Sequence, residues 1–158
     1  MIRPSVRFLD SYMNIFLIVF FNLDEVEYTF GSSCYLFGTV EVDFPTAKAD
    51  CESSGHHLVY IETSEEQSFL ETTMANINPD RNYWIGLETN DNRDQVWMDG
   101  SAITYSNLAA INDGGECFRM LYSDNYLWHD QVPSTEEGYI CEGAIGEYII
   151  LNLLLPRF

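Results

Sequence analysis

The side chains of this chain that could carry out chemistry are 25 carboxylates, three histidines and four cysteines. His56 and His57 are neighbours, and on an extended chain neighbouring side chains point to opposite faces. They cannot both bind one metal ion, and with only His129 besides, the sequence does not predict a zinc site. The carboxylates are scattered, and the chain has neither a glycine-rich phosphate loop nor a nucleophile motif. The sequence therefore predicts a binding protein and not an enzyme.

The charge of the chain narrows the class of partner. With 25 acidic residues against 7 basic ones, the net charge at pH 7 is −18. A surface this negative repels phosphates, so nucleic acid is excluded as a partner and an anionic membrane is disfavoured. The acidity is compatible with a cation such as calcium, with a basic protein, or simply with a well-solvated exterior. A hydrophobic content of 46% in 158 residues predicts one folded domain with a true core.

The two ends of the chain differ in kind from its middle. Arg3 and Arg7 precede an apolar run at residues 15–21, which is typical of a secretory signal peptide and too short to span a bilayer. We expect residues 1–27 to be a signal peptide or an N-terminal extension, and the protein to be secreted and extracellular; a buried N-terminal strand, or a true start at Met13, are the alternatives. Residues 144–158 form an apolar C-terminal tail that is also too short to span a membrane.

Helical patterns occupy the first half of the middle region. Residues 44–55 predict a helix with Pro45 in its first turn and Gly55 at its end. Three of its residues share one face at spacings of three and four, and this face should be buried: Phe44, Ala47 and Cys51. Ser64 and Gln67 then match a capping box that opens a second helix. Its apolar stripe consists of Leu70, Met74 and Ile77.

Short apolar runs predict strands between and after these helices. They lie at residues 57–61, 83–87, 117–122, 126–129 and 138–142. The stretch at residues 89–116 is rich in Asn, Asp, Ser and Gly, and an irregular stretch of this length in a compact domain is usually functional.

Several short motifs in a fixed order resemble the C-type lectin domain. They are Cys34-Tyr35, the helix ending in Cys51 with Gly55 and Leu58 behind it, Trp84-Ile85-Gly86-Leu87, Trp97-Met98-Asp99-Gly100-Ser101, Trp128-His129-Asp130 and Tyr139-Ile140-Cys141-Glu142. The resemblance implies an α+β, C-type lectin-like fold over residues 28–143, with two helices, small antiparallel sheets and a long loop region. The run Asn125-Tyr126-Leu127-Trp128 is also similar to secreted single-domain invertebrate lectins of the perlucin type.

Four cysteines allow three pairings, between which the residues alone do not choose. The resemblance implies a disulfide between Cys51 and Cys141. It leaves Cys34 and Cys117 without their usual family partners, because no cysteine precedes Cys34 and none follows soon after Trp128. These two could pair with each other, but the family fold places them far apart. We therefore expect them to be unpaired or to form an intermolecular bridge, which would make a disulfide-linked dimer.

The resemblance also bears on calcium. In sugar-binding members of the family, the ion is held by a Glu-Pro-Asn or Gln-Pro-Asp tripeptide on the long loop, a following Glu, and the Asn and Asp after the last Trp, and the same groups bind sugar hydroxyls. Here no proline lies between Pro79 and Pro133, and His129 stands where the family has Asn, so the motif is degenerate. The candidate calcium ligands are Asp130, Glu116, Asn112 and Asp113. The candidate sugar-binding residues are Asn112, Glu116, His129 and Asp130.

Aromatic side chains offer a second way to hold a sugar, by stacking. Tyr105, Tyr122 and Tyr126 are candidates for such a platform, although core or ordinary surface positions are the more common fate of such residues. Trp84, Trp97 and Trp128 match core positions of the family.

Two functions remain in competition. The first is a secreted lectin-like protein that binds carbohydrate or glycoprotein, in which calcium is at most a weak cofactor. The alternative is an interaction or matrix module that binds a basic protein or a mineral through its acidic surface.

Overall fold

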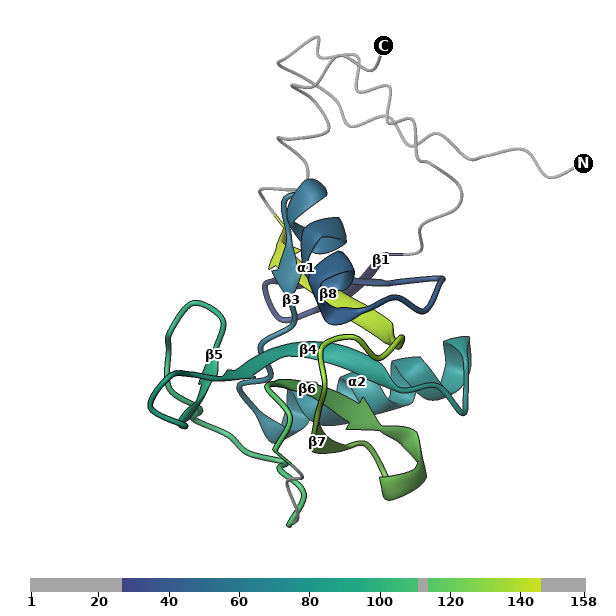
Figure 1. Ribbon diagram of the computed structural model, residues 1–158. Helices are drawn as coiled ribbons and strands as arrows, with labels where there is room; N and C mark the ends of the chain where they lie inside the picture. Colours follow the sequence, from purple (N-terminus) through teal and green to yellow (C-terminus); the bar gives the residue numbers. More distant parts are fainter. Residues whose placement is uncertain (1–26, 111–113, 146–158) are drawn as a thin grey trace, which may run out of the picture.

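A computed structural model (Figure 1) describes residues 27–110 and 114–145. The expected signal peptide or N-terminal extension at residues 1–27 lies outside the described part except for Glu27, and so does the expected tail at residues 144–158 except for its first two residues. Within that part, no helix is both long and apolar enough to cross a membrane. The helices and strands follow in the order β1 (Glu27–Phe30), β2 (Ser33–Phe37), α1 (Phe44–Ser53), β3 (His57–Leu58), α2 (Ser64–Ile77), β4 (Tyr83–Thr89), β5 (Gln95–Trp97), β6 (Cys117–Leu121), the 3-10 turn η1 (Tyr122–Asp124), β7 (Leu127–Gln131) and β8 (Gly138–Ala144).

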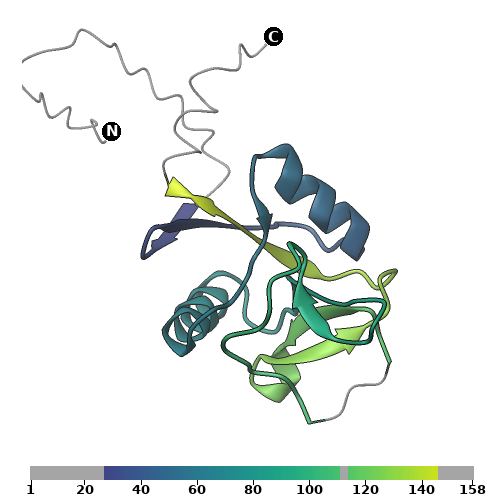
Figure 2. The same cartoon turned by 90° about the vertical axis from the view of Figure 1, so that its left-hand side faces the viewer.

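The strands form a mixed sheet in the order β1-β2-β8-β4-β6-β7, with β3 attached to β8 and β5 to β4. All of these pairings are antiparallel except that of β4 with β8, which is parallel. Strand β8 thus joins the β1–β2 hairpin to β4, which in turn pairs with the β6–β7 hairpin. The predicted α+β architecture with two helices is confirmed, and Figure 2 shows α1 and α2 on opposite sides of the β2–β8 ribbon.

Helix α1 forms where the sequence predicts it. The Asp43 side chain accepts a hydrogen bond from the Thr46 amide at 3.0 Å and so caps the first turn, in which Pro45 costs no hydrogen bond. The expected apolar face, Phe44, Ala47 and Cys51, is buried.

Helix α2 differs from its prediction at both ends. The capping residue is Thr63 and not Ser64, because the Thr63 hydroxyl accepts from the Glu66 amide at 3.1 Å. At the other end Ile77, expected in the buried stripe, is 40% exposed. It is the last residue of the helix and lies beyond the part that packs on the sheet through Leu70 and Met74.

The strands differ from the predicted runs mainly in their bounds. The first run shrinks to His57–Leu58, and the last two extend to Gln131 and Ala144. The polar stretch at residues 89–116 also contains strand β5, which the composition did not indicate. Strand β5 forms because it pairs with β4, in a register that places Trp97 opposite Leu87.

Two buried clusters make up the core on either side of the sheet. Trp97 and Trp128 belong to the larger cluster, and Trp84 packs with Cys51 and Cys141 in the smaller one. All three tryptophans are essentially inaccessible, which confirms their prediction as core residues.

Candidate functional site

Asp130 lies on β7, where its side chain holds the end of the long loop. Its Oδ2 atom accepts hydrogen bonds from the backbone amides of Gly114 and Gly115, each at 2.6 Å. Hydrogen bonds from amides to a carboxylate are among the stronger ones in proteins. Asp130 therefore ties the loop to the β6–β7 hairpin through the protein's own groups.

Gly115 allows the loop to approach β7 this closely. A Cβ atom at this position would lie 2.4 Å from the backbone nitrogen of Gln131, a distance that real Cβ atoms do not adopt. Gly114 has a φ of 91°, which is a conformation that favours glycine. The pair Gly114-Gly115 is thus the local reason why two amides can converge on one carboxylate oxygen.

His129 is the neighbour of Asp130 on β7 and faces the other side of the sheet. Its Nε2 atom lies 2.8 Å from Oδ2 of Asp124, which belongs to the turn between β6 and β7. Across the strand pair it stands opposite Arg119, which forms an ion pair with the buried Glu137. The structure therefore separates His129 from Asp130 and places it among charged side chains of the hairpin.

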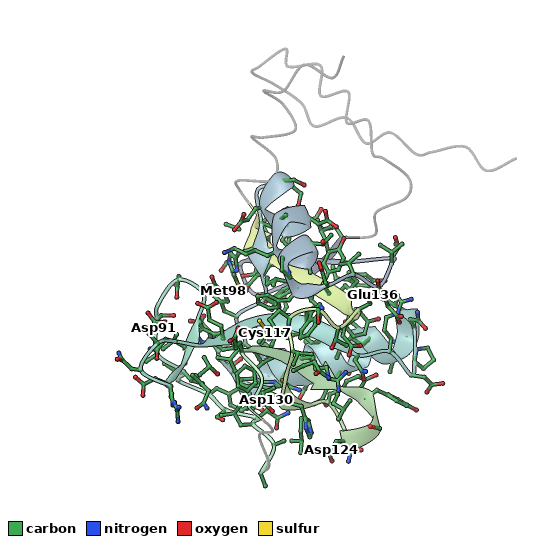
Figure 3. All side chains as sticks on the ribbon, in the orientation of Figure 1. Asp91, Met98, Cys117, Asp124, Asp130 and Glu136 are labelled. Carbon is green, nitrogen blue, oxygen red and sulfur yellow. A yellow bond between two sulfur atoms is a disulfide. The ribbon has the colours of Figure 1, made fainter. Side chains whose placement is uncertain are left out.

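The remaining candidate residues come from the loop before β6. Glu116 is exposed, and its backbone carbonyl accepts from the Thr89 amide at 2.9 Å. Asn112 and Asp113 lie outside the described residues. Within the described ranges, no three His, Cys, Asp or Glu side chains cluster as metal ligands would. Figure 3 shows Asp130 and Asp124 on the lower hairpin, with Asp130 nearer the loop.

The three candidate tyrosines take different positions. Tyr126 is buried, and Tyr105 packs edge-on against the Trp128 ring, with 5.8 Å between centroids. Tyr122 is 42% exposed and contacts Tyr126 edge-on at 5.8 Å. Only Tyr122 of these three offers a substantial surface for stacking.

The cysteines follow the pairing that the resemblance implied. Cys51 of α1 and Cys141 of β8 form a disulfide that spans 90 residues of sequence. Cys34 and Cys117 are free and buried. Burial, with Glu27 nearby, raises the pKa of the Cys34 thiol to about 11, and burial, with Glu88 and Glu116 nearby, raises the pKa of Cys117 to about 12. Because the thiolate is the reactive form, this favours free thiols over an intermolecular bridge.

Sequence reasoning missed the partners of the candidate residues. The glycines that bind Asp130 are 15 and 16 residues before it, and no pattern in the sequence connects them. The contact between Asp124 and His129 had a weak signal in the sequence. The five residues between β6 and β7 include Asn125 and have the length of a typical hairpin connection, which brings Asp124 close to the start of β7.

The fold and the loop region together define a binding scaffold: helices and a mixed sheet support a long loop that returns to the β6–β7 hairpin. The chain belongs to the C-type lectin family, since the model of the Lectin C-type domain matches residues 40–143. This is a family of binding proteins and not of enzymes.

Relatives and solved structures agree with this assignment. C-type lectin domain family 4 member G of Mus musculus is 34% identical over 124 residues, which is 72% of this chain and 40% of that protein. Perlucin-like protein of Mytilus galloprovincialis is 32% identical over 120 residues, which is 70% of this chain and 76% of that protein. The chain thus spans well under half of the length of the mouse relative.

Two solved structures are similar at the level of the fold. The Ca2+-independent C-type lectin SPL-2 from Saxidomus purpuratus has a TM-score of 0.68 and 32% identity, and the match covers 74% of this chain and 90% of that one. A structure described as an SPL-1–GlcNAc complex has a TM-score of 0.68 and 29% identity, and the match covers 74% of this chain and 91% of that one.

Proposed function

We propose that the protein is a secreted lectin that binds carbohydrate, and that this binding does not require calcium. The contact surface in this proposal is formed by the end of β7 and the loop before β6, with Glu116 and Asp130 as its described residues and Asn112 as a further candidate. Calcium at this surface would be a weak cofactor at most.

The observation that carries the proposal is the pair of hydrogen bonds that Asp130 accepts from the loop. This residue is the one firm match to the calcium ligands of the family, and in this chain it accepts two short hydrogen bonds from loop amides. These bonds position the loop without a cation. His129, the other candidate on β7, faces the opposite side of the sheet, where its Nε2 atom lies 2.8 Å from Asp124, so it is not part of this surface.

Two of the similar solved structures support calcium-independent binding of carbohydrate. One is described as calcium-independent, and another was solved with GlcNAc. The disulfide between Cys51 and Cys141 supports the extracellular location, because disulfides persist in oxidising compartments.

A glycan array tests the proposal if it is probed once with calcium and once with a chelator. We expect the same glycans, GlcNAc-terminated ones among them, to bind in both conditions. A signal that is lost with the chelator would refute calcium-independent binding. No signal in either condition would refute the lectin itself.

The formal charge of −18 favours a second function, in which the acidic surface binds a basic protein or a mineral. Screening by salt should weaken such a contact. Binding to a basic partner with an affinity that stays constant from low to high salt would count against it.

A further inference from the structure

A partly open cavity of about 100 Å³ lies between the second half of α1, strand β3 and the residue that follows β5. Its lining consists of Lys48, Glu52, His57, Leu58, Tyr60 and Met98. Figure 3 shows Met98 between α1 and the β5 hairpin, well separated from Asp130 and Asp124. The cavity is therefore distinct from the proposed carbohydrate surface.

A column of aromatic rings forms one wall. The His57 ring lies 4.2 Å from the Tyr60 ring between centroids, with 31° between planes, and Tyr60 stacks on Trp97 at 5.4 Å and 26°. Trp97 is 1% exposed, so the column is anchored in the core and ends at the cavity. Gly86 makes room for it, because a Cβ atom there would lie 2.5 Å from the Tyr60 ring.

Carboxylates dominate the charge around the wall. Glu52 lines the cavity, and an oxygen of Glu142 accepts from the Tyr60 amide at 3.1 Å. Burial, together with the nearby charges of Asp99 and Glu88, raises the pKa of the Tyr60 phenol to about 12.

One basic residue opposes these charges. Lys48 Nζ is 3.9 Å from a carboxylate oxygen of Glu52, and both side chains are about half exposed. An exposed pair of this kind is worth little, so it exchanges readily for another partner.

We propose that this cavity receives the guanidinium group of an arginine side chain on a basic protein partner. The volume suits a single functional group, whereas cavities that hold whole small ligands are typically several times larger. A planar guanidinium stacks on aromatic faces and donates to carboxylate acceptors at its edge. The outer face of His57 supplies the stacking surface, because Tyr60 lies between His57 and Trp97 in the column, and Glu52 supplies the charge. This inference does not depend on the carbohydrate proposal.

The test is a titration of the full, isotope-labelled chain with N-acetyl-arginine methylamide, followed by NMR. We expect saturable shifts confined to amides around the cavity. The matching citrulline derivative, which has the same shape without the charge, should cause none.

Matched variants separate the cavity from the general acidity. Glu52→Gln and Glu136→Gln remove the same charge, but Glu136 is exposed elsewhere on the surface. Glu52→Gln should raise the dissociation constant about threefold and Glu136→Gln should leave it nearly unchanged. Lys48→Ala should tighten binding about twofold by removing the competing cation, whereas Arg93→Ala, at the exposed turn between β4 and β5, should not.

Three outcomes would overturn the proposal: shifts scattered over the surface, equal effects within each pair of variants, or equal shifts with citrulline. Saturable shifts with glucosamine but not with the arginine derivative would also refute it, since the cavity would then be an amino-sugar site. Because the variants lie outside the carbohydrate surface, a failed glycan array would leave these results interpretable.

Discussion

At the scale of single residues, Asp130 occupies a position that binds calcium in sugar-binding members of the family, but in this chain it stabilises the loop. Its carboxylate accepts hydrogen bonds from the amides of Gly114 and Gly115. We predict that Asp130→Ala lowers the free energy of unfolding by about 1.5–3 kcal/mol, the usual value of hydrogen bonds to a charged group. Asp130→Asn should cost less, because its amide oxygen still accepts.

Urea unfolding in a buffer with chelator measures this change, and hydrogen exchange at the Gly114 and Gly115 amides locates it. Glu116→Ala is the control, because this exposed neighbour should change stability by no more than about 0.5 kcal/mol. If the two alanine variants were equally stable in chelator, Asp130 would have no structural role without a metal.

At the scale of elements, the start of α2 separates two adjacent residues that look equivalent in the sequence. Thr63 caps the helix, whereas the Ser64 hydroxyl donates to Glu65 on the surface. We predict that Thr63→Ala lowers the free energy of unfolding by about 1 kcal/mol and that Ser64→Ala changes it by less than about 0.5 kcal/mol. Thermal or urea unfolding of both variants checks the order, and a reversed order would mean that Ser64 is the cap.

The elements also show what local patterns can predict. The face of α1 was predictable because Phe44, Ala47 and Cys51 repeat at helical spacing, and one buried face follows from that repeat. The exposure of Ile77 was not, because it depends on where the sheet ends beneath α2. Strand β5 was not predictable either, since it forms through pairing with β4 and not through its own composition.

At the scale of the whole molecule, charge should control stability as the pH changes. Burial raises the pKa of Glu66 above its ordinary value near 4.5, so just above pH 4.5 the folded state keeps a proton that the unfolded state has lost. Rising pH through this window therefore lowers stability, and the repulsion within a chain of net charge −18 acts in the same direction. Hydrogen bonds from Thr46 and Ser101 lower the pKa of Asp43 and Asp99, respectively, below the ordinary value of 3.8. These two carboxylates therefore stabilise the folded state above pH 3.8, and this contribution is lost as the pH decreases below that value.

We therefore predict a maximum of stability between about pH 3.8 and 4.5, with losses on both sides. Urea unfolding at about pH 3, 4, 5 and 7 and constant ionic strength measures it. Glu66→Gln should flatten the change between pH 5 and 7, and high salt should flatten it further. Stability that rose steadily from pH 3 to 7 would contradict this account.

The candidate site was predictable only in part. The motif around Trp128 pointed to Asp130, and the missing proline pointed away from the usual calcium cage. The actual contacts of Asp130 join residues 15 and 16 positions apart, and they depend on the register of β6 against β7. The cavity beside Tyr60 had no signal at all, because α1, β3 and the end of β5 meet there from separate parts of the chain.

By itself the sequence determined the family, the two helices, the buried tryptophans and the overall acidity, because composition and short motifs are local properties that survive without coordinates. Only the tertiary structure decided what the charged and polar groups do. It bound Asp130 to Gly114 and Gly115, paired His129 with Asp124, and stacked His57 on Tyr60 beside Glu52. The physical reason is that a side chain acts through atoms within a few ångströms, and strand pairing and helix packing choose which distant residues come that close.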